Sequence, residues 1–167
     1  MLATEPVRDD NVIYTFHDYD PMTFTHQGAS WVSPNYISLH GVPYPSSPEA
    51  VAPLLGEVPD EMAQVQLKRY GLERWNGARL AAEIGLAAEW ARRRHVPLWC
   101  GEFGVYRAYA PPAARAAWLS DMRHALEANG IGWTMWDYQG GFALVTKKDG
   151  VATPDPAILD ALGLARR

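Results

Sequence analysis

Three short apolar runs along the chain predict three buried strands. They are residues 11–16 (NVIYTF), 97–104 (PLWCGEFG) and 131–136 (IGWTMW), and each is rich in β-branched or aromatic residues. Runs of this length, apolar on every side, are typical of parallel strands that are covered on both faces. We therefore expect a parallel sheet whose strands are joined by long crossover connections.

Two amphipathic helices are predicted between and after the later runs. One set of apolar residues recurs at helical spacing behind Asn76, a residue type that caps helices: Leu80, Ile84, Ala87, Ala88 and Ala91. A second set follows Pro111 and Pro112, which can begin a helix: Trp118, Leu119, Met122 and Leu126. A last short helix is expected behind Asp155. The alternation of strands and helices favours an α/β fold with helices outside a parallel sheet.

Residues 17–75 form a long connection in this pattern. They contain many proline, glycine and serine residues, and no helical period continues across them, although residues 60–70 could form a short helix behind Asp60. A connection this long inside a compact domain is uncommon and is usually functional.

Polar and aromatic residues follow each predicted strand, where α/β folds bind their ligands. Glu102 ends the second strand, and a carboxylate placed there costs free energy unless it is paired or has a chemical task. A structural pairing with Arg107 and a catalytic role are both compatible with the pattern. His17 and Tyr19 follow the first strand and, two residues apart, should point to one side.

The same pattern leaves alternatives open for the neighbours of Glu102. A tyrosine hydroxyl near it could donate a hydrogen bond that favours the ionised carboxylate. His17 could instead be a structural histidine bonded to the main chain. Trp136, after the third strand, could stack under a sugar ring or only pack the top of the sheet. Asp18 and Asp137 should point away from this site.

Composition narrows the function further. Seven tryptophans and eight tyrosines suit a carbohydrate cleft, although such residues also fill cores. A net charge of −4 without a long basic run gives no reason to expect nucleic acid. No apolar stretch is long enough for a membrane span. The N-terminus does not have the pattern of a signal peptide, and a single cysteine leaves the cellular compartment open.

Other catalytic and cofactor sites are not predicted. The remaining histidines show no metal-like spacing with carboxylates or cysteine, so we expect no metal: His26, His40, His95 and His124. No phosphate loop or serine nucleophile motif occurs. Cys100 lies within a strand and should be a small buried residue. No cofactor is expected.

Four segments, taken in order, closely resemble the C-terminal part of glycoside hydrolase family 5, the cellulase family of (β/α)8 barrels. They are residues 11–32, 70–92, 97–107 and 132–146, including the motifs HDYDPMTFTHQGASW, LWCGEFGVY and GWTMWDYQGG. The resemblance covers nearly the whole chain. It implies that residues 1–167 are a C-terminal half-barrel, with strands six to eight, their helices and a long loop after strand six.

The resemblance also implies roles for the residues at the strand ends. Glu102 corresponds to the catalytic nucleophile, His17 and Tyr19 to a pair that lines the central subsite and orients it, and Trp136 to the tryptophan under the sugar. The implied reaction is retaining hydrolysis of a β-1,4-glucan polysaccharide or oligosaccharide through a glycosyl–enzyme intermediate. A secreted location would follow from the family alone.

The motifs of the family's strands two to four, which carry the acid/base, do not occur in this sequence. We therefore expect a truncated frame, a fragment, or a barrel whose other half is a separate chain. Three strands would leave an uncovered sheet, so a homo-oligomer or a complex with an N-terminal barrel fragment is expected. The alternative function is a weak or inactive self-associating half-barrel that retains some glucan binding. A dedicated carbohydrate-binding module fits poorly, because this pattern is α/β.

Overall fold

A three-stranded parallel sheet forms the centre of the computed structural model, which describes residues 4–164. The strands β1 (Tyr14–His17), β2 (Leu98–Glu102) and β3 (Gly132–Trp133) lie in the order β1-β2-β3. This confirms the predicted α/β architecture and all three strands. β3 is shorter than predicted, although the main-chain N–H of Thr134 still donates to Cys100 at 2.9 Å.

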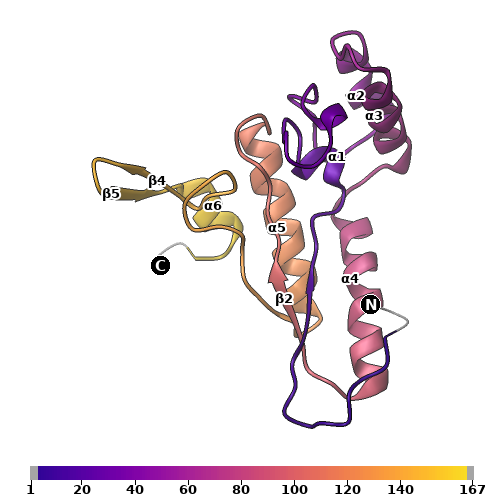
Figure 1. Ribbon diagram of the computed structural model, residues 1–167, viewed down its shortest axis with the longest axis vertical. Coiled ribbons are helices and arrows are strands. Elements are labelled where there is room, and N and C mark those ends of the chain that lie inside the picture. Colours follow the sequence, from indigo (N-terminus) through magenta and orange to yellow (C-terminus); the bar gives the residue numbers. More distant parts are fainter. Residues whose placement is uncertain (1–3, 165–167) are drawn as a thin grey trace.

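Helices α4 (Gly77–Arg94) and α5 (Pro112–Ala128) pack side by side against one face of the sheet (Figure 1). The Asn76 side chain caps α4, as predicted, by accepting from the Arg79 N–H at 3.0 Å. All four predicted core residues of α5 are buried. On α4, Ala87 is only half-buried and Trp90 is buried instead. Within residues 4–164, no helix combines the length and apolar character needed to cross a membrane.

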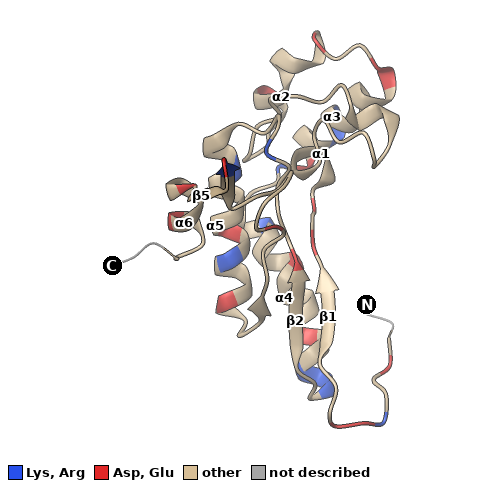
Figure 2. Ribbon diagram, turned by 60° about the vertical axis from the view of Figure 1, so that its left-hand side comes forward, with Lys and Arg blue, Asp and Glu red and all other residues tan. Residues whose placement is uncertain are grey.

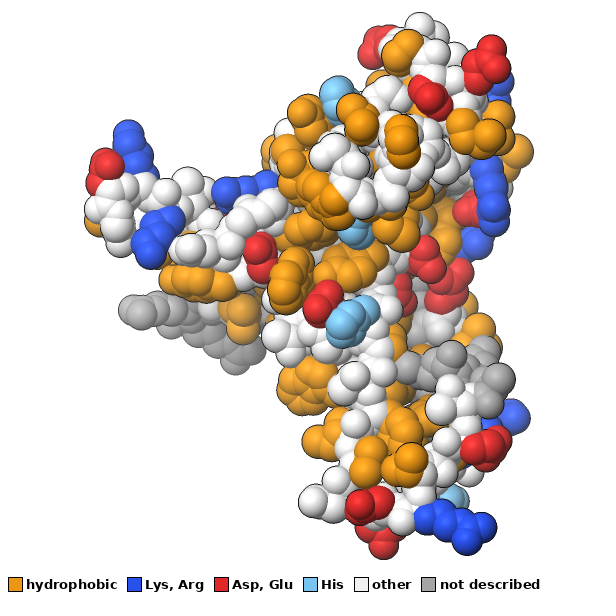
Figure 3. Space-filling view, viewed as in Figure 1, with side chains coloured by type: hydrophobic (Ala, Val, Ile, Leu, Met, Phe, Trp, Pro, Cys, Tyr) orange, Lys and Arg blue, Asp and Glu red, His pale blue; other side chains and the backbone are white. Residues whose placement is uncertain are grey.

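The opposite face of the sheet has no covering layer in the described part of the chain. Trp99 of β2 is 39% exposed, and Ile13, just before β1, is 63% exposed. Among residues 4–164, β1 and β3 each pair with β2 alone, so the sheet also has two open edges there. In Figure 3, hydrophobic side chains gather on this side around acidic and histidine side chains. This face of the sheet is therefore open to solvent.

The segment between β1 and α4 contains more helix than predicted, between stretches without regular structure such as residues 37–47. It contains α1 (Met22–Thr25), the 3-10 helix η1 (Pro34–Tyr36), α2 (Pro48–Leu55) and α3 (Glu61–Glu73). The first three have eight residues or fewer, too short to show a helical period. Only α3, capped by Asp60 as predicted, has a length that the pattern could indicate.

A second sheet follows β3, where only a glycine-rich loop was predicted. Strands β4 (Val145–Lys148) and β5 (Val151–Pro154) form an antiparallel hairpin that projects from the body. Asp149 and Gly150 form its turn with φ of 49° and 81°. An Asp-Gly pair with both φ values positive is typical of two-residue hairpin turns. The Asp-Gly pair in the sequence thus indicated a hairpin at this position. Helix α6 (Pro156–Ala161) then begins at the Asp155 cap, as predicted.

Candidate active site

A bulge in β2 decides which way Glu102 points. Thr15 pairs with Trp99 and Phe16 with Cys100, but His17 pairs with Glu102, so one extra residue lies between Cys100 and Glu102. In a regular strand without the bulge, Glu102 would lie two residues after the buried Cys100 and would point with it toward the helices. The extra residue is Gly101. A Cβ there would lie 3.1 Å from His17 Nε2, so a side chain at this position would crowd the histidine.

Glu102 meets both residues that were predicted to surround it. The Tyr19 hydroxyl donates to Glu102 Oε2 at 2.9 Å, and His17 Nδ1 lies 3.4 Å from the same oxygen. Burial and the hydrogen bond to Glu102 raise the pKa of the Tyr19 phenol far above its ordinary value. The phenol therefore remains a donor throughout the physiological pH range, and it orients the carboxylate rather than exchanging protons with it.

The structural alternatives for these residues find no counterpart in the structure. Arg107 donates to the main chain of Val145 and to the hydroxyl of Thr146 rather than to Glu102. The side chain of His17 is half exposed and faces the carboxylate. Acidic residues lie at the carboxyl ends of both β1 and β2 (Figure 2). The end of the sheet is thus the place where the chemistry-bearing side chains gather.

Trp136 lies on the same face of the sheet as Glu102. Its main-chain N–H donates to the carbonyl of Phe103 at 2.9 Å, which fixes it beside the residue that follows Glu102. Its side chain is 48% exposed. Thr134, two residues earlier, bonds the indole of Trp99 at 3.0 Å on this face. Trp136 therefore presents a half-exposed ring near the carboxyl end of β2.

Buried Arg115 forms hydrogen bonds to two loops at this end of the sheet, one after β2 and one after β3. Its guanidinium donates to the carbonyls of Val105 at 3.2 Å and of Phe142 and Ala143 at 2.8 Å each. Burial lowers its pKa to about 10, so it remains charged at neutral pH. Three charge-assisted bonds from one planar group hold the loop after β2 against the loop after β3.

Two other carboxylates near the strand ends differ in their surroundings. Asp18 faces the groove between β1 and α4 together with Glu83 and Ile84, away from Glu102 as predicted. Burial is the main reason that the pKa of Asp18 rises to about 6. Asp137 was also expected to point away, but it lies close enough to Tyr19 to raise the pKa of the phenol slightly. Nothing in this geometry makes either residue a partner of Glu102 in catalysis.

Sequence patterns did not identify the residues that support Tyr19 from behind. Thr25 and His26 of the α1 segment are buried, and Phe142 from the loop after β3 packs on both aromatic rings. In the sequence, His26 lacks metal-like spacing, and no pattern indicates that it contacts Tyr19. Within residues 4–164, no group of three His, Cys, Asp or Glu side chains is placed to hold a metal ion. Cys100 is buried as predicted, and burial raises the pKa of its thiol to about 12.

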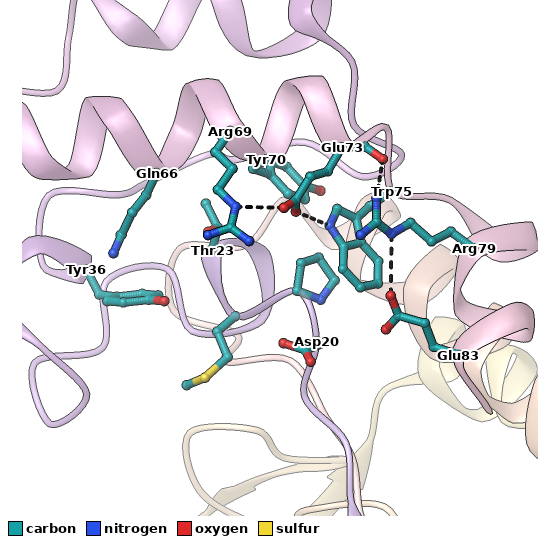
Figure 4. A pocket seen from close by; sticks show the side chains of 12 residues that line it. Asp20, Thr23, Tyr36, Gln66, Arg69, Tyr70, Glu73, Trp75, Arg79 and Glu83 are labelled. Carbon is teal, nitrogen blue, oxygen red and sulfur yellow. Dashed lines mark hydrogen bonds and ion pairs between the residues drawn. The ribbon is translucent and has the colours of Figure 1, made fainter. Parts of the chain in front are cut away.

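A separate polar hollow of about 420 Å³ lies beyond Asp20, between α1, α3 and α4 (Figure 4). Four of its charged side chains form two pairs, Arg69 with Glu73 at 2.7 Å and Arg79 with Glu83 at 3.4 Å, and Asp20 lines it as well. None of the four predicted site residues lines it. The hollow is therefore distinct from the surroundings of Glu102.

Comparison with known proteins gives a consistent set of similarities. A family model described as cellulase, glycosyl hydrolase family 5, matches residues 1–141. Endoglucanase 3 of Fibrobacter succinogenes is 30% identical over 145 residues, covering 84% of this chain and 22% of that protein. Endoglucanase C of Acetivibrio thermocellus is 32% identical over 133 residues, covering 80% of this chain and 38% of that protein. The chain thus spans less than half the length of these relatives.

Solved structures show the same relationship in three dimensions. A hyperthermophilic endo-β-1,4-glucanase in complex with substrate superposes with a TM-score of 0.68 at 29% identity, over 95% of this chain and 42% of that chain. Endoglucanase Cel5A of Thermotoga maritima gives a TM-score of 0.65 at 27% identity, over 95% of this chain and 41% of that chain. The sheet and its helices are therefore arranged as in part of these enzymes.

Proposed function

Because the chain belongs to the cellulase family, glycosyl hydrolase family 5, we propose that it carries the nucleophile of a retaining hydrolase of β-1,4-glucans. The contact between Tyr19 and Glu102 Oε2 is the observation that carries the proposal. It orients a partly exposed carboxylate at the carboxyl end of a parallel strand, which is where such folds place their chemistry. The endoglucanases among its relatives point to glucan as the substrate class.

In this mechanism Glu102 attacks the anomeric carbon and forms a covalent glycosyl–enzyme intermediate, which water then hydrolyses. Tyr19 holds one oxygen of the carboxylate, so that the other is free to approach the sugar. His17 flanks the same oxygen and lines the central subsite. Trp136 supplies the aromatic surface under the reacting sugar. These roles rest on the arrangement around Glu102 and on the family resemblance.

We further propose that residues 1–167 form the C-terminal half of a (β/α)8 barrel, with β1, β2 and β3 as strands six to eight. Retaining hydrolysis needs a second carboxyl group about 5–5.5 Å from the first. Asp18 does not supply it, because it faces α4. The acid/base then comes from a complementary barrel segment that covers the open face of the sheet.

An activated substrate separates the role of Glu102 from that of the acid. Dinitrophenolate leaves without protonation, so dinitrophenyl β-cellobioside should give a burst of up to one equivalent per chain even where carboxymethyl-cellulose is not cleaved. Glu102→Gln should abolish the burst, whereas the exposed Glu57→Gln should not. A 2-fluoro analogue should attach to the peptide that contains Glu102, as read by mass spectrometry. Labelling elsewhere, or a burst that survives Glu102→Gln, would contradict the proposal.

The open sheet favours a second candidate function, a self-associating half-barrel with weak glucan binding and no catalysis. Both edges of the sheet and its inner face are exposed. The burst from the chain alone with the activated cellobioside, compared with Glu102→Gln, distinguishes the two. No burst from the unmodified chain, together with stable oligomers, would support the scaffold. A burst that is lost in the variant would support the hydrolase.

A further inference from the structure

Tyr19 lies beyond the end of β1, so the sheet alone does not fix it. The last bond from the sheet to this segment runs from the N–H of Asp18 to the carbonyl of Glu102 at 3.0 Å. The carbonyl of Tyr19 instead accepts from the hydroxyl of Thr25 at 2.5 Å. A buried side chain of α1 thus holds the main chain of the residue that contacts the carboxylate.

The hydrogen bonds of Thr25 determine where His26 carries its proton. Thr25 Oγ1 also lies 3.0 Å from His26 Nδ1. A hydroxyl has one proton to donate, and the carbonyl of Tyr19 can only accept. The hydroxyl proton therefore points to Tyr19, since the carbonyl of Pro21 is farther away at 3.5 Å. It follows that Nδ1 of His26 bears the hydrogen and donates to Thr25.

The ring of His26 also contacts the ring of Tyr19. Their centroids lie 5.0 Å apart at an angle of 74°. Phe142 completes a three-ring cluster, 5.8 Å from Tyr19 and 5.3 Å from His26. Edge-to-face pairs of this kind stabilise a defined ring orientation. Burial lowers the pKa of His26 to about 4, so the imidazole is neutral at ordinary pH and suits this apolar contact.

We propose that His26 and Thr25 are positioning residues, which hold the main chain and the ring of Tyr19 so that its hydroxyl reaches Glu102. The relay runs from His26 Nδ1–H to Thr25 Oγ1, and from the Thr25 hydroxyl to the carbonyl of Tyr19. This inference rests on the proposed function for its catalytic meaning. The geometry that it predicts can be measured without turnover.

The first test uses the unmodified chain. Nitrogen-15 NMR of His26 should show a neutral ring with the proton on Nδ1. A neutral ring protonated on Nε2 would overturn the relay, whatever the behaviour of any variant.

The second test compares two substitutions of one residue. Thr25→Val removes the hydroxyl and keeps the shape, whereas Thr25→Ser keeps the hydroxyl. A fluorotyrosine at position 19 reports its own titration by fluorine NMR. Thr25→Val should lower the titration midpoint by about one pH unit, a tenfold change in proton affinity, because the bond to Glu102 is loosened. Thr25→Ser should restore it.

Substitutions of His26 complete the experiment. His26→Phe keeps a ring but loses the Nδ1 donor, and should shift the midpoint in the same direction, while the exposed His124→Phe should not. A variant that is less stable to urea but leaves the titration of position 19 unchanged would show that the role is merely structural. If the titration responds but Glu102 is not labelled by the fluoro sugar, the positioning holds and the proposed function fails.

Discussion

Single residues set the reactivity of the site, and Glu102 receives its partners from the last residue of β1 and from the segment that follows it. Tyr19 and His17 both contact Oε2. The residue types at the strand ends, and the side to which His17 and Tyr19 point, could be predicted from alternation along the strand. The direction of Glu102 could not, because a bulge is a change of register that residue types alone do not reveal.

The hydroxyl of Tyr19 should contribute directly to the rate of glycosylation. Tyr19→Phe removes one hydrogen bond to a charged group, worth about 1.5–3 kcal/mol, so the burst with the activated cellobioside should slow about 10- to 100-fold. Stopped-flow absorbance measures that rate. Tyr138→Phe, on a side chain that is 62% exposed, is the matched control. An unchanged rate in Tyr19→Phe would remove the phenol from the mechanism.

Asp18 should make the chain less stable as pH rises through its titration. Its pKa is raised from 3.8 to about 6, so between these values the folded state binds more protons than the unfolded state. Stability therefore falls from about pH 4 to pH 6. Asp18→Asn should stabilise the chain at pH 7 by roughly 1–3 kcal/mol and have little effect near pH 4. Urea unfolding at both pH values measures the difference.

The contribution of His26 to folding stability changes with pH in the opposite direction, which provides an internal check on Asp18. Its pKa falls from 6.5 to about 4, so the unfolded state binds more protons over this range and stability rises with pH. In the unmodified chain the two slopes offset each other between pH 4 and 6. In Asp18→Asn the rise due to His26 should remain. A flat profile in the variant would contradict the lowered pKa of His26, and identical profiles for the two proteins would contradict the raised pKa of Asp18.

At the level of elements, length decides what the sequence could predict. α4 and α5 are long enough to show their apolar faces, and the pattern predicted where both begin and most of their buried residues. α1, η1 and α2 are too short for a period and escaped prediction, although α1 supplies Thr25 to the site. The β4–β5 hairpin has exposed residues on both faces and therefore lacks the apolar alternation of a packed strand.

The cap of α4 should have a measurable effect on stability. Asn76→Ala removes the side-chain oxygen that accepts from the N–H of Arg79, and should cost about 1 kcal/mol of folding free energy. Urea denaturation monitored by circular dichroism measures the loss. Asn11→Ala, outside any helix, should change stability by much less. Equal effects of the two substitutions would show that the cap is not what Asn76 contributes.

At the level of the whole molecule, the sheet is covered on one face only in the described residues. The sequence could predict the three strands of the parallel sheet and their order, but not the β4–β5 hairpin. It also predicted the exposed face, because motifs for only three barrel strands occur. What it could not show is how the segment between β1 and α4 folds into helices that lie beyond the carboxyl ends of the strands (Figure 1).

The open face should make the chain associate in solution. Trp99 and Ile13 expose apolar surface that water does not favour. Light scattering coupled to size exclusion should therefore give a mass above that of one chain, and Trp99→Lys should reduce it. Val65→Lys, on the exposed side of α3, should leave the mass unchanged. A single-chain mass for the unmodified protein would refute self-association and leave a complementary barrel fragment as the expected partner.

The bulge at Gly101 also bears on how sequences of this type can diverge. Whether the carboxylate of Glu102 faces the substrate side or the helices depends on whether Gly101 is accommodated as a bulge or as a regular strand position. Deleting Gly101 would make Glu102 the direct neighbour of Cys100 in a regular strand, so the two side chains would still lie on opposite faces. A related sequence that lacks this glycine can therefore keep the fold and the direction of the glutamate, whereas one that keeps the glycine but pairs the strand without a bulge would keep the fold and turn the glutamate inward.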